Sequence, residues 1–356
     1  MVKFLLTKNR SCGILFYAIF IKTLPKRREL NKMLTSVLLF AVGLVLLIKG
    51  GDWFVDGATG IAKRFNLPDI VVGATVVSIG TTLPEVMVST TGALAGSGAM
   101  AYGNAIGSII CNTALIAAIS ITCNPGPVNV KSMKTPAIFF FCSAALYCFA
   151  SYVLGEFPRW MGFVMLGIFV VYMVLTVRNG MKNPDSVAEE EEEESKPKAL
   201  WQELLLLVAG AAVIAVGADL LVDHGQIIAL ELGVPETVVA LLFVALGTSL
   251  PELVTTITSL KKGRASLGVG NVIGANVFNL VLVSGVAVSL APFPVPMENE
   301  LLNTGLNMSL VFEIPVMLGV MSLMIFPALL TKKLGRWQGI ALLAIYAAFC
   351  VCQFVL

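Results

Sequence analysis

A repeat within the chain constrains its fold more than any other feature of the sequence. Residues 50–112 align with residues 217–279 without a gap, at a constant offset of 167 residues, and 22 of the 63 aligned pairs are identical. Shared apolar composition does not match polar residues position by position, so we interpret the two stretches as copies of one structural unit. The identical pairs include Asp52/Asp219, Asp56/Asp223, Pro84/Pro251, Glu85/Glu252, Asn104/Asn271 and Asn112/Asn279.

The composition places these copies in a membrane. The 356 residues are 57% hydrophobic and 13% charged, whereas soluble domains are about 25% charged. The charged residues lie in short clusters between apolar runs, and each run is long enough to cross a hydrocarbon core of about 30 Å. A net charge of +2 is too small to indicate nucleic acid as a partner. The lipid bilayer is therefore the expected surrounding.

Ten apolar segments predict an all-α membrane protein. An odd number of crossings per half would make the copies enter the membrane from opposite sides, so we predict two inverted five-helix repeats, an architecture typical of secondary transporters. The predicted parts are a first repeat over 33–178, an acidic linker over 179–200 and a second repeat over 201–356. The expected spans are 34–62, 68–94, 99–121, 134–155, 159–178, 201–222, 235–260, 265–291, 310–331 and 335–356.

The distribution of basic residues predicts the orientation. With the linker in the cytoplasm, the inner loops hold fourteen basic residues and the outer loops only Arg159. Because basic loops stay inside, we expect a multi-pass inner-membrane protein with its core termini outside. The inner set is Lys63, Arg64, Lys131, Lys134, Arg178, Lys182, Lys196, Lys198, Lys261, Lys262, Arg264, Lys332, Lys333 and Arg336.

Residues 1–32 do not fit this orientation. They carry eight basic residues, and their one apolar run, about 12–21, is too short to span a membrane. No small-residue cleavage site follows the run, so it resembles a signal peptide only weakly. We interpret 1–32 as a non-native or mis-assigned extension and Met33 as the start of the protein.

Each repeat contains an apolar helix that is interrupted at its middle. The strings are GTTLPE at 80–85 and GTSLPE at 247–252. Proline cannot donate to the carbonyl four residues earlier, and such broken backbone is tolerated at membrane depth only where it is buried in protein or lines a cavity. A glutamate, Glu85 or Glu252, directly follows each proline. Two carboxylates placed symmetrically beside freed carbonyls and hydroxyls predict a site for hard cations.

The next segment of each repeat carries a second motif. GNAIGSIICN covers 103–112 and GNVIGANVFN covers 270–279. Its asparagines and Ser108 are spaced by four or eight residues and share one helical face, where amide oxygens can complete a cation shell. The glycines at spacing four predict close helix approach.

These paired motifs resemble the two alpha repeats of the sodium/calcium exchanger superfamily, in its prokaryotic branch. GDWFVDG at 51–57 and GRWQG at 335–339 also look like this family, so that the resemblance covers essentially all of 34–356. It implies four adjacent cation sites between the second, third, seventh and eighth helices. The ligands that it implies are Glu85, Glu252, Thr81, Thr248, Thr82, Ser249, Ser78, Ala245, Ser108, Asn112 and Asn279, with Ser78 and Ala245 acting through their carbonyls.

Two positions depart from the family pattern. Ala275 stands where a serine is common, and Asn279 stands where some members carry an aspartate. The central cluster therefore has two formal negative charges, which match one calcium ion but leave the number and identity of the coupled ions open. We expect packing roles for the cysteines, a helix-end role for His224 and a solvated-linker role for Glu189 to Glu194. Asp52, Asp56, Asp219 and Asp223 fit helix-end solvation or structural pairing, with a part in the ion pathway as the alternative.

The predicted function is secondary active exchange of Na⁺ for Ca²⁺ by alternating access, with the ions bound at the membrane midplane. We expect a monomer that is not an enzyme and has no cofactor, with Ca²⁺ and Na⁺ as its transported ions. The alternatives are a H⁺/Ca²⁺ or K⁺-dependent exchanger and a passive cation channel. An intramembrane hydrolase is disfavoured because the sequence shows no nucleophile–base pair.

Overall fold

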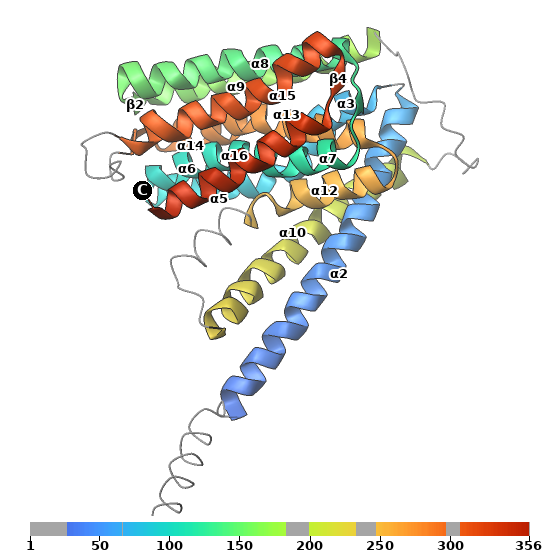
Figure 1. The fold of residues 1–356 in the computed structure, drawn as a ribbon, viewed down its shortest axis with the longest axis vertical. Helices are drawn as coiled ribbons and strands as arrows, with labels where there is room; N and C mark the ends of the chain where they lie inside the picture. Colours follow the sequence, from blue (N-terminus) through green and yellow to red (C-terminus); the bar gives the residue numbers. More distant parts are fainter. Residues whose placement is uncertain (1–26, 66, 183–198, 233–246, 297–306, 356) are drawn as a thin grey trace, which may run out of the picture.

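The computed structural model describes residues 27–65, 67–182, 199–232, 247–296 and 307–355, and nearly all of them are helical (Figure 1). Several helices contain a single π-helical turn, labelled η. The helices of the first half are α2 (Arg27–Arg64), α3 (Asp69–Val72), η1 (Gly73–Val77), α4 (Ser78–Thr81), α5 (Leu83–Leu94), α6 (Gly98–Cys111), η2 (Asn112–Ala117), α7 (Ala118–Cys123), α8 (Val130–Cys148), η3 (Phe149–Leu154) and α9 (Arg159–Lys182). Those of the second half are α10 (Leu200–Glu231), α12 (Leu250–Lys261), α13 (Ala265–Phe278), η4 (Asn279–Val283), α14 (Ser284–Leu290), η6 (Ser309–Glu313), α15 (Ile314–Thr331) and α16 (Arg336–Val355).

The described helices confirm a multi-pass membrane protein. Eight of them are long and apolar enough to cross a bilayer, and α3 to α5 form a ninth candidate span that is bent by 46°. These nine coincide with nine of the ten expected segments. The remaining one, 235–260, lies partly outside the described residues, and its described part is α12. The acidic run 189–194 and the stretch 1–26 also lie outside them, so the predictions for these stretches stay untested.

Local structure repeats at the same offset as the sequence. The bounds of α12 and α13 match those of α5 and α6 after subtraction of 167 residues, and so do the starts of η4 and η2. The turn before α6 and the turn before α13 each contain a glycine with a positive φ, Gly96 at 85° and Gly263 at 71°. Only glycine adopts this conformation without strain, so the two copies fold through the same turn.

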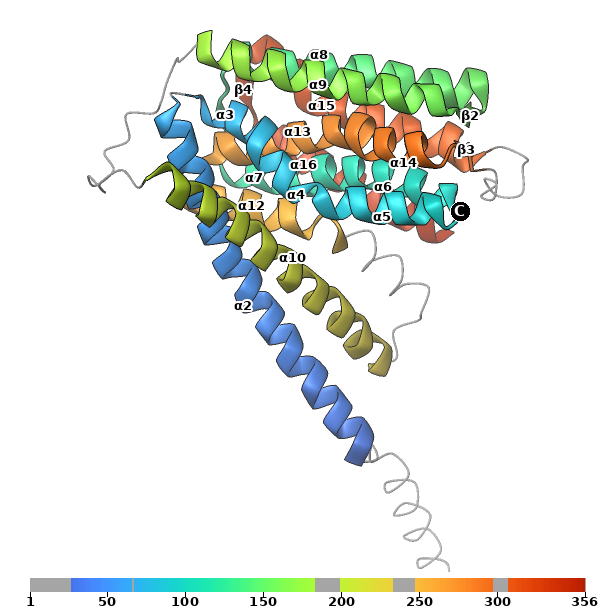
Figure 2. The ribbon, with the colours of Figure 1, turned by 180° about the vertical axis from the view of Figure 1, so that it is seen from behind.

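Helices α2 and α10 lie side by side and run obliquely to the other helices (Figures 1 and 2). Glycines let their backbones touch: a Cβ on Gly43 would lie 2.9 Å from the carbonyl oxygen of Gly217, and one on Gly217 would lie 2.9 Å from that of Gly43. Gly50 and Gly210 form the second such pair. Because the repeat relates Gly43 to Gly210 and Gly50 to Gly217, the two contacts are equivalent.

The centre of the bundle is formed by two continuous spans, α6–η2–α7 and α13–η4–α14. In the most apolar 18-residue window of each span, 72% and 83% of the residues are buried, against 17–39% in the other long spans. Every residue from Leu267 to Phe278 is buried. The outer helices instead expose large apolar side chains, as expected for a surface in contact with lipid.

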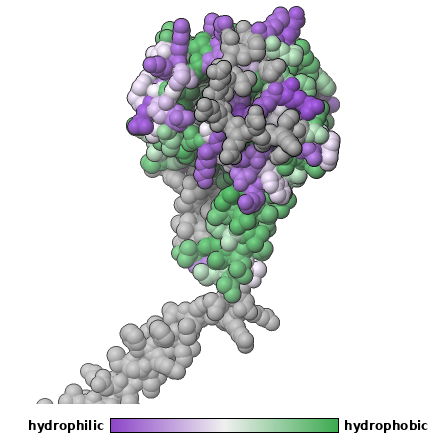
Figure 3. Space-filling model, turned by 90° about the vertical axis from the view of Figure 1, so that its right-hand side faces the viewer, coloured by the Kyte–Doolittle hydropathy of each residue, from purple (hydrophilic) through white to green (hydrophobic). Residues whose placement is uncertain are grey.

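Two short antiparallel strand pairs join loops of the two halves. Strand β1 (Gly126–Pro127) pairs with β4 (Lys333–Leu334), and β2 (Glu156–Phe157) pairs with β3 (Phe293–Pro294). Figure 3 shows hydrophilic residues gathered at one end of the bundle, with apolar residues on its flanks. This polar end is where Figure 1 places β4 and α3.

The α2–α10 crossing gives a stability prediction. A Cβ on Gly210 would lie 2.5 Å from the Phe54 nitrogen and 2.8 Å from its Cα, so Gly210→Ala should lower the free energy of unfolding by about 1–3 kcal/mol. The matched control is Gly167→Ala on α9, where a Cβ meets no described atom within 4 Å. Thermal unfolding of the two detergent-purified variants makes the comparison, and equal melting temperatures would contradict the packing argument.

Candidate cation-binding site

The site is built on the two proline-interrupted helices. Pro84 and Pro251 each occupy the first turn of a helix, α5 or α12, that begins where the preceding backbone breaks. At the first break, the N–H of Thr82 donates to the carbonyl of Ser78 at 3.0 Å, and Pro84 has no N–H with which to continue the pattern. The break places the next residue, a glutamate, in the first turn of the following helix, near the positive end of the helix dipole.

The glutamates are completely buried. Glu85 and Glu252 both have 0% exposure, and none of their four carboxylate oxygens has a hydrogen-bond partner within the described protein. The two carboxyl groups lie close enough to interact electrostatically. Burying a charge without a partner costs several kcal/mol, so this arrangement is suited to a cation that supplies the missing positive charge.

Unpartnered neutral groups lie on the interrupted helices and on the π-turns that pack against them, η2 against α12 and η4 against α5. The hydroxyls of Thr82 and Ser249 and the amides of Asn112 and Asn279 are buried, and none of these groups has a hydrogen-bond partner among the described residues. Asn112 begins the π-turn η2 and Asn279 begins η4, which is the kind of position where π-turns accompany function. Such oxygens satisfy a hard cation without adding further charge.

Residues at the first break lie near the glutamate of the second half. The hydroxyls of Thr81 and Thr82 are neighbours of the Glu252 carboxyl group, although no hydrogen bond of acceptable geometry joins them to it. Hydrogen bonds also join the motifs of the two halves directly, because Asn104 contacts both the carbonyl of Glu85 and the hydroxyl of Thr248.

The other predicted ligands differ in their surroundings. Ser108 is buried on α6, and Thr248 is half-buried and donates its hydroxyl to Asn104 Oδ1 at 3.3 Å. The carbonyl of Ser78 accepts the Thr82 N–H, which leaves its second lone pair for other contacts. Ala245 lies outside the described residues, so its carbonyl remains a prediction.

Asn104 and Asn271 have a different role from the other asparagines of their motifs. Their spacing predicts that they share a helical face with Asn112 and Asn279, where an amide can complete a cation shell. In the structure their side chains bind protein groups: Asn271 Oδ1 accepts from the hydroxyl of Thr81 at 3.2 Å and lies 3.2 Å from the hydroxyl oxygen of Ser78. The sequence signal that marks them is their identity at equivalent repeat positions, but spacing alone does not separate a ligand from a supporting amide.

Close approach of helices was predicted at Gly103, Gly107, Gly270 and Gly274, and it is present at the last two, on α13. A Cβ on Gly103 or Gly107 would meet no described atom within 4 Å, so the described residues do not bear out the prediction on α6. A Cβ on Gly270 would collide with the carbonyl of Ile70, and one on Gly274 would lie 2.5 Å from the Cα of Ala74. The second-half helix therefore packs directly on α3 and η1, which lead to the first break. Larger residues would push Ser78 away from Asn271.

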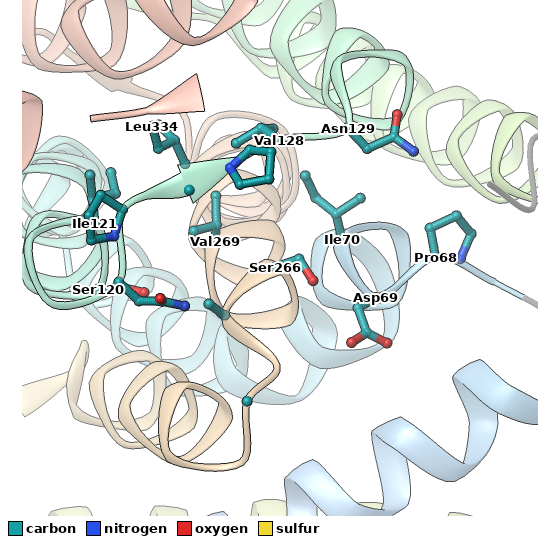
Figure 4. Close-up of a pocket in the computed structure, with 16 residues that line it drawn as sticks. Pro68, Asp69, Ile70, Ser120, Ile121, Val128, Asn129, Ser266, Val269 and Leu334 are labelled. Carbon is teal, nitrogen blue, oxygen red and sulfur yellow. The ribbon is translucent and has the colours of Figure 1, made fainter. Parts of the chain in front are cut away.

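A cavity of about 390 Å³ opens at the polar end of the bundle (Figure 4). It is lined by both halves, with Ile70 on α3, Ser120 on α7 and Val269 on α13. Asp69 of its lining forms an ion pair, in which Arg264 Nη1 lies 3.1 Å from both carboxylate oxygens. Ile70 of the lining also contacts Gly270 on α13.

The aspartates, the cysteines and His224, which the sequence also singled out, have structural surroundings of their own. Lys262 Nζ pairs with Asp56 at 2.7 Å and lies 3.9 Å from Asp52, which is the structural pairing favoured for these aspartates. The six described cysteines are free thiols, and His224 lies half-buried on α10. Within the described residues there is no cluster of three or more His, Cys, Asp or Glu that could hold a metal. The candidate site thus combines two carboxylates with neutral oxygens, a donor set for hard cations.

A multi-pass helical protein with buried, unpaired carboxylates beside interrupted helices belongs to the class of membrane ion transporters. A sequence model described as "Sodium/calcium exchanger protein" matches residues 35–178 and 203–355. The chain therefore belongs to the sodium/calcium exchanger family, and the predicted resemblance is confirmed.

Individual relatives agree with this assignment. An uncharacterised membrane protein of Methanocaldococcus jannaschii is 34% identical over 308 residues, covering 86% of this chain and 94% of the relative. The sodium/calcium exchanger MaX1 of Methanosarcina acetivorans is 29% identical over 354 residues, covering 90% of this chain and 98% of MaX1. A structure of the sodium–calcium exchanger NCX_Mj, soaked with Na⁺ and Sr²⁺, superposes with a TM-score of 0.73 at 32% identity, covering 90% of this chain and 99% of that one.

The unpartnered amides give a prediction that separates binding from stability. Asn112→Leu removes buried polar atoms that make no hydrogen bond, so the ion-free variant should be at least as stable as the wild type, by about 0–2 kcal/mol. It should also lose the rise in melting temperature that added Ca²⁺ produces. Thermal unfolding with and without Ca²⁺ measures both effects.

The control is Asn276→Leu on α13. This buried amide donates to Thr113 Oγ1 at 2.7 Å, so the variant should be destabilised but should keep its response to Ca²⁺. A destabilised Asn112→Leu that still responds to Ca²⁺ would show that Asn112 is a structural residue.

Proposed function

We propose that this protein is a secondary active antiporter that exchanges Na⁺ for Ca²⁺. The observation that carries the proposal is the burial of four carboxylate oxygens, from Glu85 and Glu252, without hydrogen-bond partners in the described protein. Two carboxylates give a central charge of −2, which one Ca²⁺ neutralises. Membership of the sodium/calcium exchanger family supports the choice of ions.

The proposed ligands surround this pair of charges. Calcium takes six to eight oxygen ligands from carboxylates, carbonyls, amides and hydroxyls, and sodium can use the same oxygens. Occupation by one ion should therefore exclude the other. The proposed set is Glu85, Glu252, Thr81, Thr248, Thr82, Ser249, Ser78, Ala245, Ser108, Asn112 and Asn279.

We propose alternating access for the transport cycle. The equivalent helix bounds and the equivalent glycine contacts of α2 and α10 support two inverted repeats around one midplane site. Such repeats can exchange conformations, so that a path open to one side closes as the other opens. The cavity of Figure 4 is the proposed approach from the polar end, which the basic residues assign to the cytoplasm.

The rival coupling ion is the proton. The same glutamates could bind protons in place of sodium, which would make the protein a H⁺/Ca²⁺ exchanger. A potassium-dependent exchanger remains a further alternative. A passive channel is less favoured, because inverted repeats within one chain favour alternating access.

The glutamates provide a direct test. Glu85→Gln and Glu252→Gln should each reduce Na⁺-gradient-driven Ca²⁺ flux in proteoliposomes by at least about a hundredfold, because one unit of the central charge is lost. The control is Glu313→Gln on η6, whose carboxylate binds Ser309 and Gln353 outside the site. Wild-type flux in either site variant would overturn the assignment of the glutamates.

The coupling ion is tested in vesicles loaded with Ca²⁺. An inward Na⁺ gradient, with the pH difference collapsed by a protonophore, should drive Ca²⁺ out. If more than two Na⁺ exchange for each Ca²⁺, the flux should also respond to an imposed membrane potential. Efflux that follows only an imposed pH gradient would exclude sodium and retain the exchanger class, whereas efflux without any counter-gradient would indicate a channel.

A further inference from the structure

Asn104 and Asn271 occupy equivalent positions of the repeat, on α6 and α13. Asn271 is completely buried and Asn104 is half-buried. Each stands eight residues before the asparagine that begins the π-turn of its span. Their amides contact both helix breaks, and these contacts cross between the two halves.

The contacts of Asn271 reach the first break. Thr81 Oγ1 donates to Asn271 Oδ1 at 3.2 Å, and Ser78 Oγ lies within hydrogen-bond distance of the same oxygen, at 3.2 Å, and of the Asn271 carbonyl, at 2.9 Å. All these contacts use Asn271 as an acceptor. The single hydroxyl hydrogen of Ser78 is shared with the closer carbonyl of Gly73, at 2.8 Å, so the hydroxyl that Asn271 holds is that of Thr81.

The contacts of Asn104 join both breaks. Its Oδ1 accepts from Thr248 Oγ1 of the second half at 3.3 Å. Its Nδ2 donates to the carbonyl of Glu85 at 3.3 Å and to Ser89 Oγ at 2.8 Å, both in the first half. The common element of the two asparagines is that each accepts the hydroxyl hydrogen of the equivalent threonine, Thr81 or Thr248, from the opposite half.

We propose that Asn104 and Asn271 are positioning residues that hold the hydroxyl hydrogens of Thr248 and Thr81 away from the cation site. A hydroxyl has one hydrogen and two lone pairs. When the hydrogen is donated to an asparagine, both lone pairs of the threonine oxygen remain for a cation. The proposal deepens the cation-exchange function and rests on it.

The alternative orientation shows why a separate acceptor is needed. The Thr81 hydroxyl is a neighbour of the Glu252 carboxylate. Without Asn271, its hydrogen would turn to that carboxylate, because a hydrogen bond to a charged acceptor is stronger than one to a neutral acceptor. The threonine would then occupy a carboxylate oxygen that the cation needs. Asn271 therefore acts on binding through Thr81 and needs no contact with the ion.

A double-mutant cycle tests this coupling. The variants are Asn271→Leu, Thr81→Val and the double variant, and the measurement is equilibrium binding of ⁴⁵Ca²⁺ to detergent-purified protein. Each single variant should raise the Kd about tenfold, as expected for the loss of one hydrogen bond or ligand. The double variant should be no weaker than the weaker-binding single variant, because both substitutions remove the same oriented hydroxyl.

Two further measurements keep the test decisive. Asn276→Leu, the buried amide on the same helix that contacts Thr113, should leave the Kd within about twofold of the wild type. If Asn271→Leu does not fold, the same cycle is made with Asn104→Leu and Thr248→Val, where the asparagine is only half-buried.

The outcomes separate the two proposals. Additive effects, with a Kd raised about a hundredfold in the double variant, would overturn the positioning role while leaving cation binding intact. An unchanged Kd in both asparagine variants would overturn it as well. Failure of the wild-type protein to bind Ca²⁺ would overturn the proposed function itself. Sodium coupling does not affect the result, because binding is measured without a gradient.

Discussion

The mutual proximity of two buried carboxylates sets the conditions that the rest of the structure must meet. Glu85 and Glu252 lie in an interior where charges are poorly screened, and their charges repel each other. Within the described residues, no arginine or lysine pairs with either of them. A mobile cation or proton would neutralise them, and an ion would bind best to oxygens that are already in place before it arrives. Preorganisation of this kind requires a rigid framework.

Backbone contact between helices can provide this rigid framework. Gly270 and Gly274 have no side chain, so α13 packs directly on α3 and η1, which lead to the first break. That approach brings Asn271 to Ser78 and Thr81, so the hydrogen bonds between the halves depend on the absence of side chains along the seam. In a membrane, close backbone packing and hydrogen bonds between helices replace much of the hydrophobic driving force of soluble proteins. The same contacts thus stabilise the bundle and orient the site.

Much of this organisation could be predicted from the sequence. The repeat, the apolar segments and the strings GTTLPE and GTSLPE predicted nine described spans, the helix breaks and the burial of both glutamates, because each depends on local chemistry. The division of labour among the asparagines could not be predicted. Asn271 and Asn279 share a helical face, and only the position of the neighbouring helix decides that the first binds the Thr81 hydroxyl while the second has no partner among the described residues. The π-turns were also missed, since they leave no clear sequence signal.

The two copies of the repeat are nearly identical around the glutamates but differ in the turns between their helices, α5 to α6 in the first copy and α12 to α13 in the second. At the polar end, Lys262 pairs with Asp56, and Arg264 pairs with Asp69, so the turn between α12 and α13 is tied to both α2 and α3. The positions equivalent to Lys262 and Arg264 are Ala95 and Ser97, which cannot form ion pairs. Exposed pairs contribute little, but the Arg264–Asp69 pair is mostly buried, with side-chain exposures of 15% and 20%. The two copies therefore differ in how their corresponding turns are held: ion pairs to α2 and α3 stabilise the turn between α12 and α13, whereas the residues at the equivalent positions between α5 and α6 carry no charge.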